Sequence, residues 1–358
     1  MPRHAEGENT VMRVLHVMAA RGNGGAELYA TDAMLGLQQA GPAQCAVLHP
    51  AAPRLAEMRA GGVAVDTLPL RLPFRPLARH AMRQLITRMR PDLIHCWLRR
   101  AAELVPAHTG VPVIGWFGNY KDLRPFAHCD WFVGCTPDMA QSMRERGAPA
   151  DRVAYVPTFS SVTPAPPVTR HALDTPPDAR VLLVLSRLHP AKGLETLLDA
   201  LPDLPDCHVW LAGEGELHAA LAARAARLGV AGRVHFLGWR TDRGALLAAA
   251  DICVLPSRYE PFGTVILDAW SMDVPLVACA AAGPRAHVRD GENGMLVPID
   301  DAPALAAALR RVLDDPALAA RIVAGGRREY DAGFTPQAVT RQWLALYDRV
   351  LSARGGGR

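Results

Sequence analysis

The chain has 358 residues, half of them apolar, and carries 39 Lys and Arg against 35 Asp and Glu. This length favours two domains over one, and the composition excludes a disordered or collagen-like chain. No apolar stretch approaches the ~18–20 residues that a membrane-spanning helix needs. The polar, acidic first ten residues are unlike a secretory signal.

The first half alternates short apolar runs with helical patterns. A β-branched run at residues 11–18 is followed by the glycine-rich sequence GNGGAE (22–27) and then by a helical pattern, which is how an α/β unit opens. We expect a helix at residues 79–90 and further strands at residues 43–49, 63–68, 92–97, 111–116 and 130–135. Short strands between helices predict a parallel sheet covered on both faces.

Basic residues are concentrated in this half. Residues 1–160 hold 18 basic and 13 acidic residues, and the segment from Arg71 to Arg100 holds eight Arg and one Asp. This asymmetry indicates contact with an anionic partner, with a solvated helix face as the alternative. We do not expect nucleic acid, because no aromatic residues are interleaved with the arginines to form a stacking platform.

Residues 157–178 break the alternation with six prolines and little periodicity, which is typical of an interdomain linker. The α/β alternation then restarts. The predicted strands are 181–185, 208–212, 234–237, 252–255 and 276–278, and the predicted helices are 194–201, 217–228, 243–249, 264–271, 305–313, 317–330 and 336–352. The pattern predicts an N-terminal Rossmann-like domain at residues 1–165 and a second one at residues 179–335.

The seven cysteines are scattered, odd in number and without a CxxC pair. This usage argues against a disulfide framework or a structural zinc site. Several stand within apolar runs, where cysteine acts as a small hydrophobic residue. We therefore expect reduced thiols in a cytoplasmic protein.

Two cations stand in the loop that follows the strand at residues 181–185. Arg187 and Lys192 are five positions apart in the sequence SRLHPAKG. Open α/β sheets place their ligands beyond the carboxyl ends of the strands. The two side chains are therefore candidates for holding a diphosphate, and a solvated basic loop is the alternative.

A second motif, PSRYEPFGTVILD (256–268), also follows a strand and opens a helix. The amides of Phe262, Gly263 and Thr264 would point at an anion. Glu260 and Asp268 are eight residues apart, which places both carboxylates on one side of the helix start. Such carboxylates suit sugar hydroxyls, and helix capping with a surface acid is the alternative.

Two weaker motifs follow neighbouring strands of the same domain. Gly213, Glu214 and Gly215 come after the strand at 208–212, and Trp239 comes after the strand at 234–237. Both loops should lie at the sheet edge that carries Arg187. A glycine after a strand is most often only a turn.

Together these motifs resemble the retaining glycosyltransferases of family 4, whose GT-B fold has two Rossmann-like domains facing each other across a cleft. The resemblance spans most of the chain and is strongest over residues 180–300. It is carried by GNGGAE (22–27), SRLHPAKGLETLL (186–198), LAGEGEL (211–217), FLGW (236–239), ADICVLPSRYEPFGTVILDAW (250–270) and GPRAHVRDGENGMLVP (283–298).

The resemblance implies a role for each motif residue. Arg187 and Lys192 match the pair that neutralises the diphosphate of a nucleotide sugar, and Glu260 matches an acid that contacts the donor sugar. Asp268 stands where the family's second acid usually holds the ribose hydroxyls, but it is one methylene shorter. The remaining substrate-binding candidates are Gly24, Gly25, Gly213, Glu214, Trp239, Phe262, Gly263 and Thr264.

It also implies that the first domain is on the acceptor side, that the second binds the nucleotide sugar, and that the helix at 336–352 returns to the first domain. The chain departs from the family at four places. Ala286 replaces a carboxylate, and Asp273 replaces a glycine before a strand. Trp97 stands where a histidine often follows His95, and residues 113–121 contain no clear counterpart of an acceptor-side histidine.

The expected activity is transfer of a sugar from a UDP- or GDP-sugar to a hydroxyl of a cell-envelope glycolipid, lipopolysaccharide or polysaccharide precursor. The resemblance implies retention. No Asp-x-Asp pair occurs, so we expect no metal and no cofactor. An anionic membrane surface could meet the Arg71 to Arg100 segment.

Other functions predict other features. A sugar-nucleotide epimerase would consume donor without an acceptor, and a non-catalytic relative would bind donor without cleaving it. A Rossmann oxidoreductase would need GxGxxG after the first strand, and residues 22–27 do not supply it.

Overall fold

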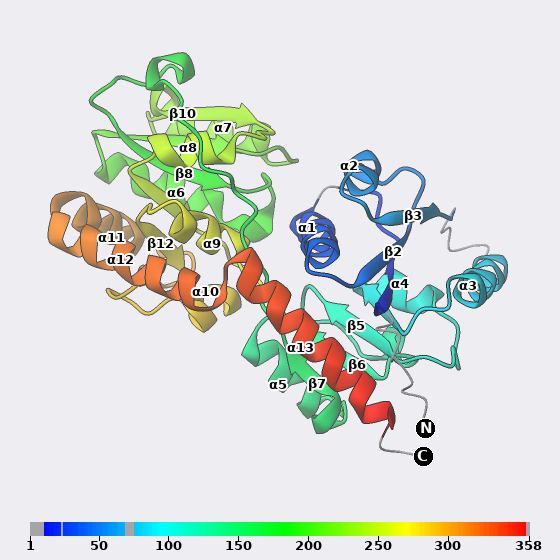
Figure 1. Cartoon of the computed structure of the whole chain (residues 1–358). Helices are drawn as coiled ribbons and strands as arrows, with labels where there is room; N and C mark the ends of the chain where they lie inside the picture. Colours follow the sequence, from blue (N-terminus) through cyan, green and yellow to red (C-terminus); the bar gives the residue numbers. More distant parts are fainter. Residues whose placement is uncertain (1–10, 23, 69–74, 356–358) are drawn as a thin grey trace, which may run out of the picture. The chain divides into compact units, whose positions relative to one another are not determined.

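The computed structural model describes residues 11–22, 24–68 and 75–355. The chain forms two compact units. One comprises the chain up to Pro157 together with the residues from Pro336 onward, and the other spans residues 158–335. Each unit is built on its own parallel β-sheet (Figure 1).

The first unit contains a seven-stranded sheet of order β3-β2-β1-β4-β5-β6-β7, with every neighbouring pair parallel. Its strands are β1 (Arg13–Met18), β2 (Ala43–Leu48), β3 (Ala64–Thr67), β4 (Leu93–Trp97), β5 (Val113–Phe117), β6 (Trp131–Gly134) and β7 (Val153–Tyr155). Its helices are α1 (Gly25–Gln39), α2 (Leu55–Ala60), α3 (Arg75–Met89), α4 (Leu98–Leu104), α5 (Pro137–Glu145) and α13 (Pro336–Gly355).

The second unit contains a six-stranded sheet of order β10-β9-β8-β11-β12-β13, also parallel throughout. Its strands are β8 (Arg180–Leu185), β9 (Cys207–Ala212), β10 (Val234–Gly238), β11 (Ile252–Leu255), β12 (Leu276–Cys279) and β13 (Met295–Val297). Its helices are α6 (Leu194–Ala200), α7 (His218–Arg227), α8 (Arg243–Ala249), α9 (Thr264–Ser271), α10 (Ala282–His287), α11 (Ala302–Asp314) and α12 (Pro316–Gly333).

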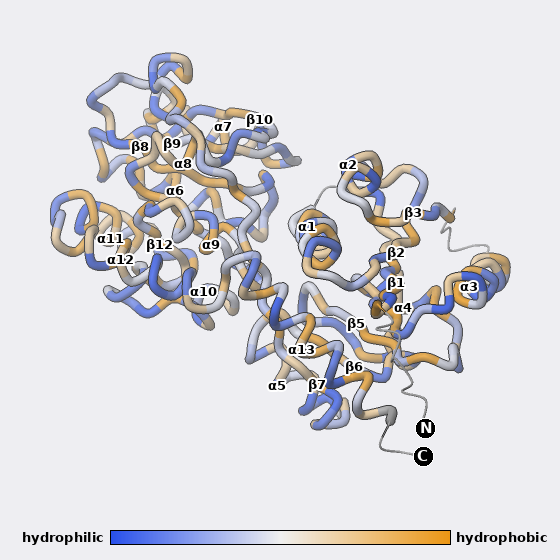
Figure 2. Tube along the Cα trace, viewed as in Figure 1, coloured by the Kyte–Doolittle hydropathy of each residue, from blue (hydrophilic) through white to orange (hydrophobic). Residues whose placement is uncertain are grey.

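Apolar side chains of the strands form the centre of each core, and hydrophobic residues follow the strands in Figure 2. The strands β4, β5 and β11 are buried at every position, as parallel strands covered on both faces should be. The proline-rich residues 158–178 belong to the second unit. There Thr175 accepts a 2.8 Å hydrogen bond from the buried Trp210 indole, and Arg170 pairs with Asp251 at 2.9 Å.

Helix α13, red in Figure 1, belongs to the first unit although it ends the chain. Its apolar stripe contains Val339, Trp343, Tyr347 and Val350, all buried. The helix packs against α1, where the Trp343 indole donates a 2.9 Å hydrogen bond to the Tyr29 hydroxyl. This apolar face of α13 therefore covers part of the core of the first unit.

The predicted fold class is confirmed, since both sheets are parallel and Rossmann-like and the last helix joins the first unit. Every strand and helix expected from the sequence is present, with ends shifted by a few residues. The helices and strands that the sequence pattern did not predict are short, with at most nine residues in a helix and three in a strand, so their periodic signal is weak. They are α2, α4, α5, α10, β7 and β13.

Candidate active site

The sheet of the second unit has its topological switch point between β8 and β11, because β9 and β10 extend to one side of this pair and β12 and β13 to the other. Ligands of open α/β sheets bind outside the carboxyl ends of the strands at such a point. The loop after β8 (186–193) and the loop after β11 (256–263) leave the sheet there. They are the loops with the two strongest sequence motifs.

Lys192 and Glu260 form an ion pair between these loops. Lys192 Nζ lies 2.6 Å from Glu260 Oε2, and both side chains are mostly buried, at 18% and 13% exposure. The Ser257 hydroxyl lies 3.5 Å from the same carboxylate oxygen. The structure thus places the cation expected to meet a diphosphate beside the acid expected to meet the donor sugar.

The N-terminus of α9 adjoins this pair, since the helix begins four residues after Glu260 and is capped by Gly263. Within the described part of the chain, the amides of Phe262, Gly263 and Thr264 donate to no acceptor. The first amides of a helix carry a partial positive charge and suit an anion. The switch point therefore combines a cation, a carboxylate and amide donors.

Two further loops, after β9 and β10, lie at this edge. Gly213, the first residue after β9, packs against the β8 loop. A Cβ at this position would collide with the carbonyl oxygen of Ser186. Leu188 donates a 2.9 Å backbone bond to Glu214, whose carboxylate accepts from the Trp239 amide at 3.4 Å. Trp239 is 49% exposed, and Arg187 is exposed. Gly213 therefore serves loop packing, whereas Arg187, Glu214 and Trp239 offer side chains to solvent.

Asp268 is fully buried. Ser160 Oγ donates to its Oδ1 at 2.6 Å, and Arg243 Nη1 lies 2.6 Å from its Oδ2. This burial excludes the alternative of a helix-surface acid. A ribose hydroxyl would have to share or replace one of these partners to reach the carboxylate.

Gly24 and Gly25 stand at the start of α1 in the first unit, where Gly24 is the N-cap. Glu27 lies in the first turn, and its Oε2 would stand 2.6 Å from a Cβ at Gly24. A carboxylate at that position stabilises the helix start and opposes an anion there. Gly22 and Glu27 line a shallow pocket at the carboxyl ends of β1 and β2.

The departures from the family pattern have structural counterparts. Asp273 adopts the left-handed conformation, with φ of 55°, and is held by Arg327 at 2.8 Å. Aspartate adopts the left-handed backbone conformation more readily than most residues, so it can stand in place of glycine at this position. Ala286 is exposed and brings no carboxylate to α10.

His95 and Trp97 are core residues of the first unit. The two rings stack with centroids 4.0 Å apart, and His95 Nδ1 lies 2.8 Å from the Tyr347 hydroxyl of α13. Burial holds the pKa of His95 well below its ordinary value. This neutral imidazole joins β4 to α13 and is fully covered from solvent.

Sequence reasoning missed three polar residues that support the candidate site. They are Ser160 and Arg243, which hold Asp268, and Arg258, which bonds to the β8 loop. Arg243 and Arg258 both appear as ordinary surface cations in the sequence. Ser160 stands more than a hundred residues from its partner, so no spacing could have identified it.

Two family models match the chain. Residues 23–160 match "Glycosyltransferase Family 4" and residues 179–315 match "Glycosyl transferases group 1". Among the described residues, no helix is both long and apolar enough to cross a membrane.

Two curated relatives from Rhizobium meliloti match almost end to end. The lipopolysaccharide core biosynthesis glycosyltransferase LpsE is 33% identical over 94% of this chain and 98% of its own length. LpsD, with the same description, is 32% identical over 96% of this chain and 100% of its own length. The crystal structure of Anabaena HepE in complex with UDP-glucose superposes with a TM-score of 0.78 at 21% identity, covering 94% of this chain and 100% of that one.

Proposed function

This chain belongs to glycosyltransferase family 4, and on that premise we propose that it transfers a sugar from a nucleoside-diphosphate sugar to a hydroxyl of a lipopolysaccharide core acceptor. The transfer retains the anomeric configuration and uses no metal ion. The observation that carries the donor half of the proposal is the Lys192–Glu260 pair beside the open amides at the start of α9.

Arg187, Lys192 and the α9 amides stabilise the leaving diphosphate. The bond from the anomeric carbon to the phosphate oxygen breaks with its electron pair passing to the diphosphate, so negative charge develops there. Positioned donors aimed at developing charge each contribute about 10²–10³ in rate. The two cations and the helix start thus take the part that a divalent metal plays elsewhere.

Glu260 accepts hydrogen bonds from the donor sugar, and Asp268 supports the ribose side of the site. The acceptor oxygen bonds to the anomeric carbon on the face that the diphosphate leaves, and its proton passes to the leaving phosphate. Glu214, Trp239, Phe262, Gly263 and Thr264 line the nucleotide side. No separate cofactor enters this step.

The names of the relatives support the proposed substrates. LpsE and LpsD are lipopolysaccharide core enzymes, which makes a core oligosaccharide the first acceptor to test. HepE was crystallised with UDP-glucose, which makes UDP-sugars the first donors, ahead of GDP-sugars.

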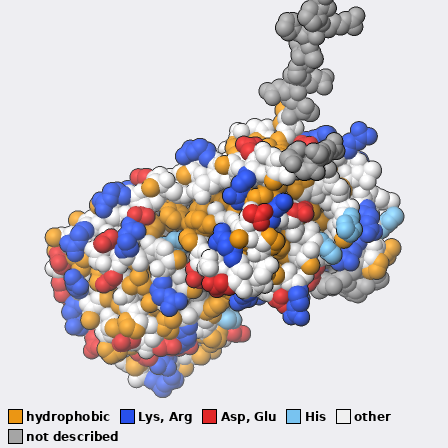
Figure 3. Space-filling view, turned by 90° about the horizontal axis from the view of Figure 1, so that it is seen from below, with side chains coloured by type: hydrophobic (Ala, Val, Ile, Leu, Met, Phe, Trp, Pro, Cys, Tyr) orange, Lys and Arg blue, Asp and Glu red, His pale blue; other side chains and the backbone are white. Residues whose placement is uncertain are grey.

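We place the enzyme in the cytoplasm, at the inner face of the membrane, with α3 as its contact to anionic lipid. Helix α3 buries Met82, Leu85 and Ile86 and exposes Arg83, while Leu77 is 68% exposed. Arg71 lies outside the described residues. The face drawn in Figure 3 intersperses basic and acidic side chains. All seven cysteines are free thiols, which supports a reducing compartment.

The test is transfer of labelled glucose from UDP-glucose to a truncated lipopolysaccharide core, with and without excess EDTA. The product should carry the sugar in the donor's anomeric configuration, and EDTA should leave the rate unchanged. Loss of activity in EDTA with recovery in Mg²⁺ or Mn²⁺ would contradict metal independence. UDP-sugar consumed without an acceptor, with a second sugar nucleotide as product, would identify an epimerase instead.

The membrane contact has its own test. Sedimentation with anionic vesicles at low salt should carry the protein down, and high salt should release it, because screening weakens charge attraction. Equal binding to neutral vesicles would contradict an electrostatic contact.

A further inference from the structure

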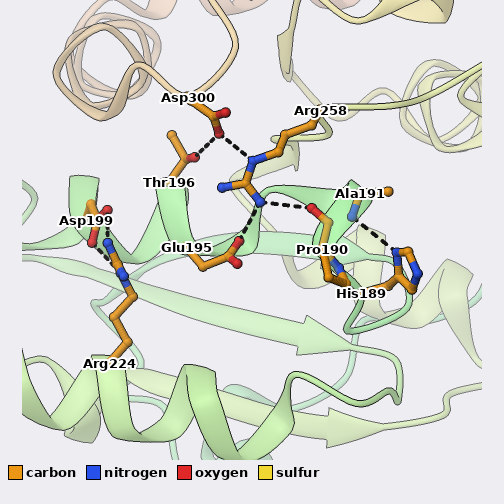
Figure 4. A network of polar contacts seen from close by, with 9 residues as sticks. All are labelled: His189, Pro190, Ala191, Glu195, Thr196, Asp199, Arg224, Arg258 and Asp300. Atoms are coloured by element: carbon orange, nitrogen blue, oxygen red, sulfur yellow. Dashed lines mark hydrogen bonds and ion pairs between the residues drawn. The ribbon is translucent and has the colours of Figure 1, made fainter.

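Arg258 joins the two loops of the candidate site through its guanidinium group. Its Nε lies 2.7 Å from Asp300 Oδ1, and its Nη1 lies 2.8 Å from the Pro190 carbonyl and 3.0 Å from Glu195 Oε2 (Figure 4). Pro190 begins the short 3-10 turn η5 (Pro190–Lys192) that carries Lys192. From this arrangement we propose that Arg258 is a positioning residue that sets the place of Lys192 at the diphosphate, an inference that rests on the proposed function.

The backbone shows how closely the two loops are joined. The amides of Arg258 and Tyr259 both donate to the Ala191 carbonyl at 3.0 Å. Gly193 has φ of 58°, and a Cβ there would collide with the carbonyl oxygen of Pro256. The loops therefore touch at three successive positions of η5, from the carbonyl of residue 190 to the ion pair of Lys192 with Glu260.

The Arg258 side chain has a structural role, whereas Lys192 is assigned to the diphosphate. Its charge is balanced by two carboxylates, Glu195 and Asp300, and Asp300 also accepts from the Thr196 hydroxyl at 3.1 Å. A guanidinium compensated in this way is a poor phosphate ligand but a good brace, because its planar fork donates in two fixed directions. It anchors η5 to the start of α6 and to Asp300, two residues before α11 begins.

Lysine at position 258 would not keep this brace. One ammonium cannot meet Asp300, Glu195 and the Pro190 carbonyl from the positions that the guanidinium uses. Without the brace, η5 keeps its backbone bonds to residues 258 and 259, but Lys192 gains freedom relative to the diphosphate. Loss of positioning by a fraction of an ångström is enough to weaken a charge contact measurably.

Arg224 is the matched control. It forms a bidentate pair with Asp199 in the same unit and has 35% side-chain exposure, against 33% for Arg258. Figure 4 draws both arginines, and Arg224 bonds to neither loop. Arg224→Ala therefore removes an arginine–carboxylate pair of similar exposure without touching the brace.

The experiment measures UDP and uridine binding by calorimetry and ligand-observed NMR. Arg258→Ala and Arg258→Lys should each weaken UDP binding about tenfold and leave uridine binding unchanged, because only the diphosphate meets Lys192. Arg224→Ala should change neither. In a Lys192→Ala background, Arg258→Ala should cause no further loss of UDP affinity.

Contrary results are distinct. Arg258 does not position Lys192 if Arg258→Ala and Arg258→Lys bind UDP as tightly as Arg224→Ala does. The same conclusion follows if uridine binding falls in parallel with UDP binding, or if the losses of UDP affinity add in the Lys192→Ala background. If the wild-type protein binds uridine but gains nothing from the diphosphate of UDP, the proposed donor site fails, and the inference fails with it.

Discussion

Lys192 Nζ lies 2.6 Å from Glu260 Oε2, so the cation that we assign to the diphosphate already holds the carboxylate that we assign to the sugar. The two charges satisfy each other in a mostly buried position between two loops. Donor binding must therefore divide this pair between the phosphate and the sugar hydroxyls. The free energy of UDP binding includes the cost of that exchange.

Glu260→Gln should consequently bind UDP more tightly than wild type, roughly 3- to 10-fold, because Lys192 no longer has a competing anion. Turnover of the sugar donor should fall, since the amide is a weaker acceptor for sugar hydroxyls. Calorimetry with UDP and initial rates with UDP-glucose measure both effects. Glu216→Gln, an exposed acid nearby, is the control. Weaker UDP binding in Glu260→Gln would mean that Glu260 supports the diphosphate site rather than competing with it.

Arg187→Ala and Lys192→Ala should each lower kcat by about 10²–10³, because each removes a charge partner of the leaving diphosphate. The effect on kcat should exceed the effect on KM, since the charge is larger in the transition state. Steady-state kinetics separate the two parameters. Arg227→Ala, on the exposed end of α7, should behave as wild type. Wild-type kcat in both variants would mean that neither Arg187 nor Lys192 stabilises the leaving diphosphate.

The buried carboxylate of Asp268 should be coupled in energy to Arg243. Asp268→Asn leaves a guanidinium without its counter-charge and should lower the free energy of unfolding by roughly 2–4 kcal/mol. In a double-mutant cycle with Arg243→Gln, the two losses should be non-additive by roughly 1–3 kcal/mol. Urea unfolding of the four proteins gives the coupling. Additive losses would show that the pair contributes nothing specific.

Glutamate at position 268 should lower the free energy of unfolding. Asp268→Glu inserts a methylene into a fully packed position, which typically costs about 1–3 kcal/mol. Although glutamate is the family's usual residue, Ser160 and Arg243 already occupy the space around the shorter carboxylate in this chain.

Sequence patterns predicted the parallel sheets and the loops of the candidate site because these features depend on local properties. The strand at residues 252–255 is a short apolar run, and the loop that follows it carries glycine and acid at fixed spacing, so both are visible in one window of the chain. Each of these signals has a period or a motif. The return of α13 to the first unit was expected from the family resemblance instead.

The polar contacts that support the site have no such signal. Ser160 meets Asp268 across 108 residues, and Arg258 meets the carbonyl of Pro190 across 68. Whether an arginine is a brace or a surface charge depends on what the fold brings beside it. The burial of His95 likewise follows from the return of α13, which places Tyr347 against an imidazole 252 residues away.

Removing the Tyr29 hydroxyl should weaken the attachment of α13. This hydroxyl accepts from the Trp343 indole at 2.9 Å and donates to the Pro157 carbonyl at 3.0 Å, in a buried position. Tyr29→Phe leaves both groups without this partner and should cost roughly 1–3 kcal/mol of unfolding free energy. Thermal melting compared with Tyr155→Phe, a partly exposed tyrosine of β7, tests this. An equal melting temperature for the two variants would mean that the hydroxyl does not hold the helix.

His16 is fully buried and bonds to both Trp97 and Gln44. The Trp97 indole donates to Nδ1 at 3.0 Å, so the neutral ring carries its proton on Nε2 and donates to the Gln44 carbonyl oxygen. A second proton on Nδ1 would face the indole N–H. Burial accordingly lowers the pKa of His16 from 6.5 to about 4, although the bond to Gln44 acts in the opposite direction.

Because the folded pKa lies below the unfolded value, the unfolded chain binds more protons between these two values. The contribution of His16 to the free energy of unfolding is therefore fully present above pH 6.5. It is lost as the pH drops toward 4, by about 3 kcal/mol for this group. In His16→Gln the amide can still donate to Gln44 but does not titrate. At pH 7 the variant should have a lower free energy of unfolding than wild type. The difference between the two free energies should shrink by roughly 2–3 kcal/mol at pH 4.5, as measured by urea unfolding at both pH values. The difference between the two proteins reports His16 together with its effect on the neighbouring His95, whose pKa His16 helps to lower, while the other histidines are common to both. A gap that stays constant with pH would mean that His16 is not held neutral by its burial, and that the contact between β1 and β4 does not depend on its charge state.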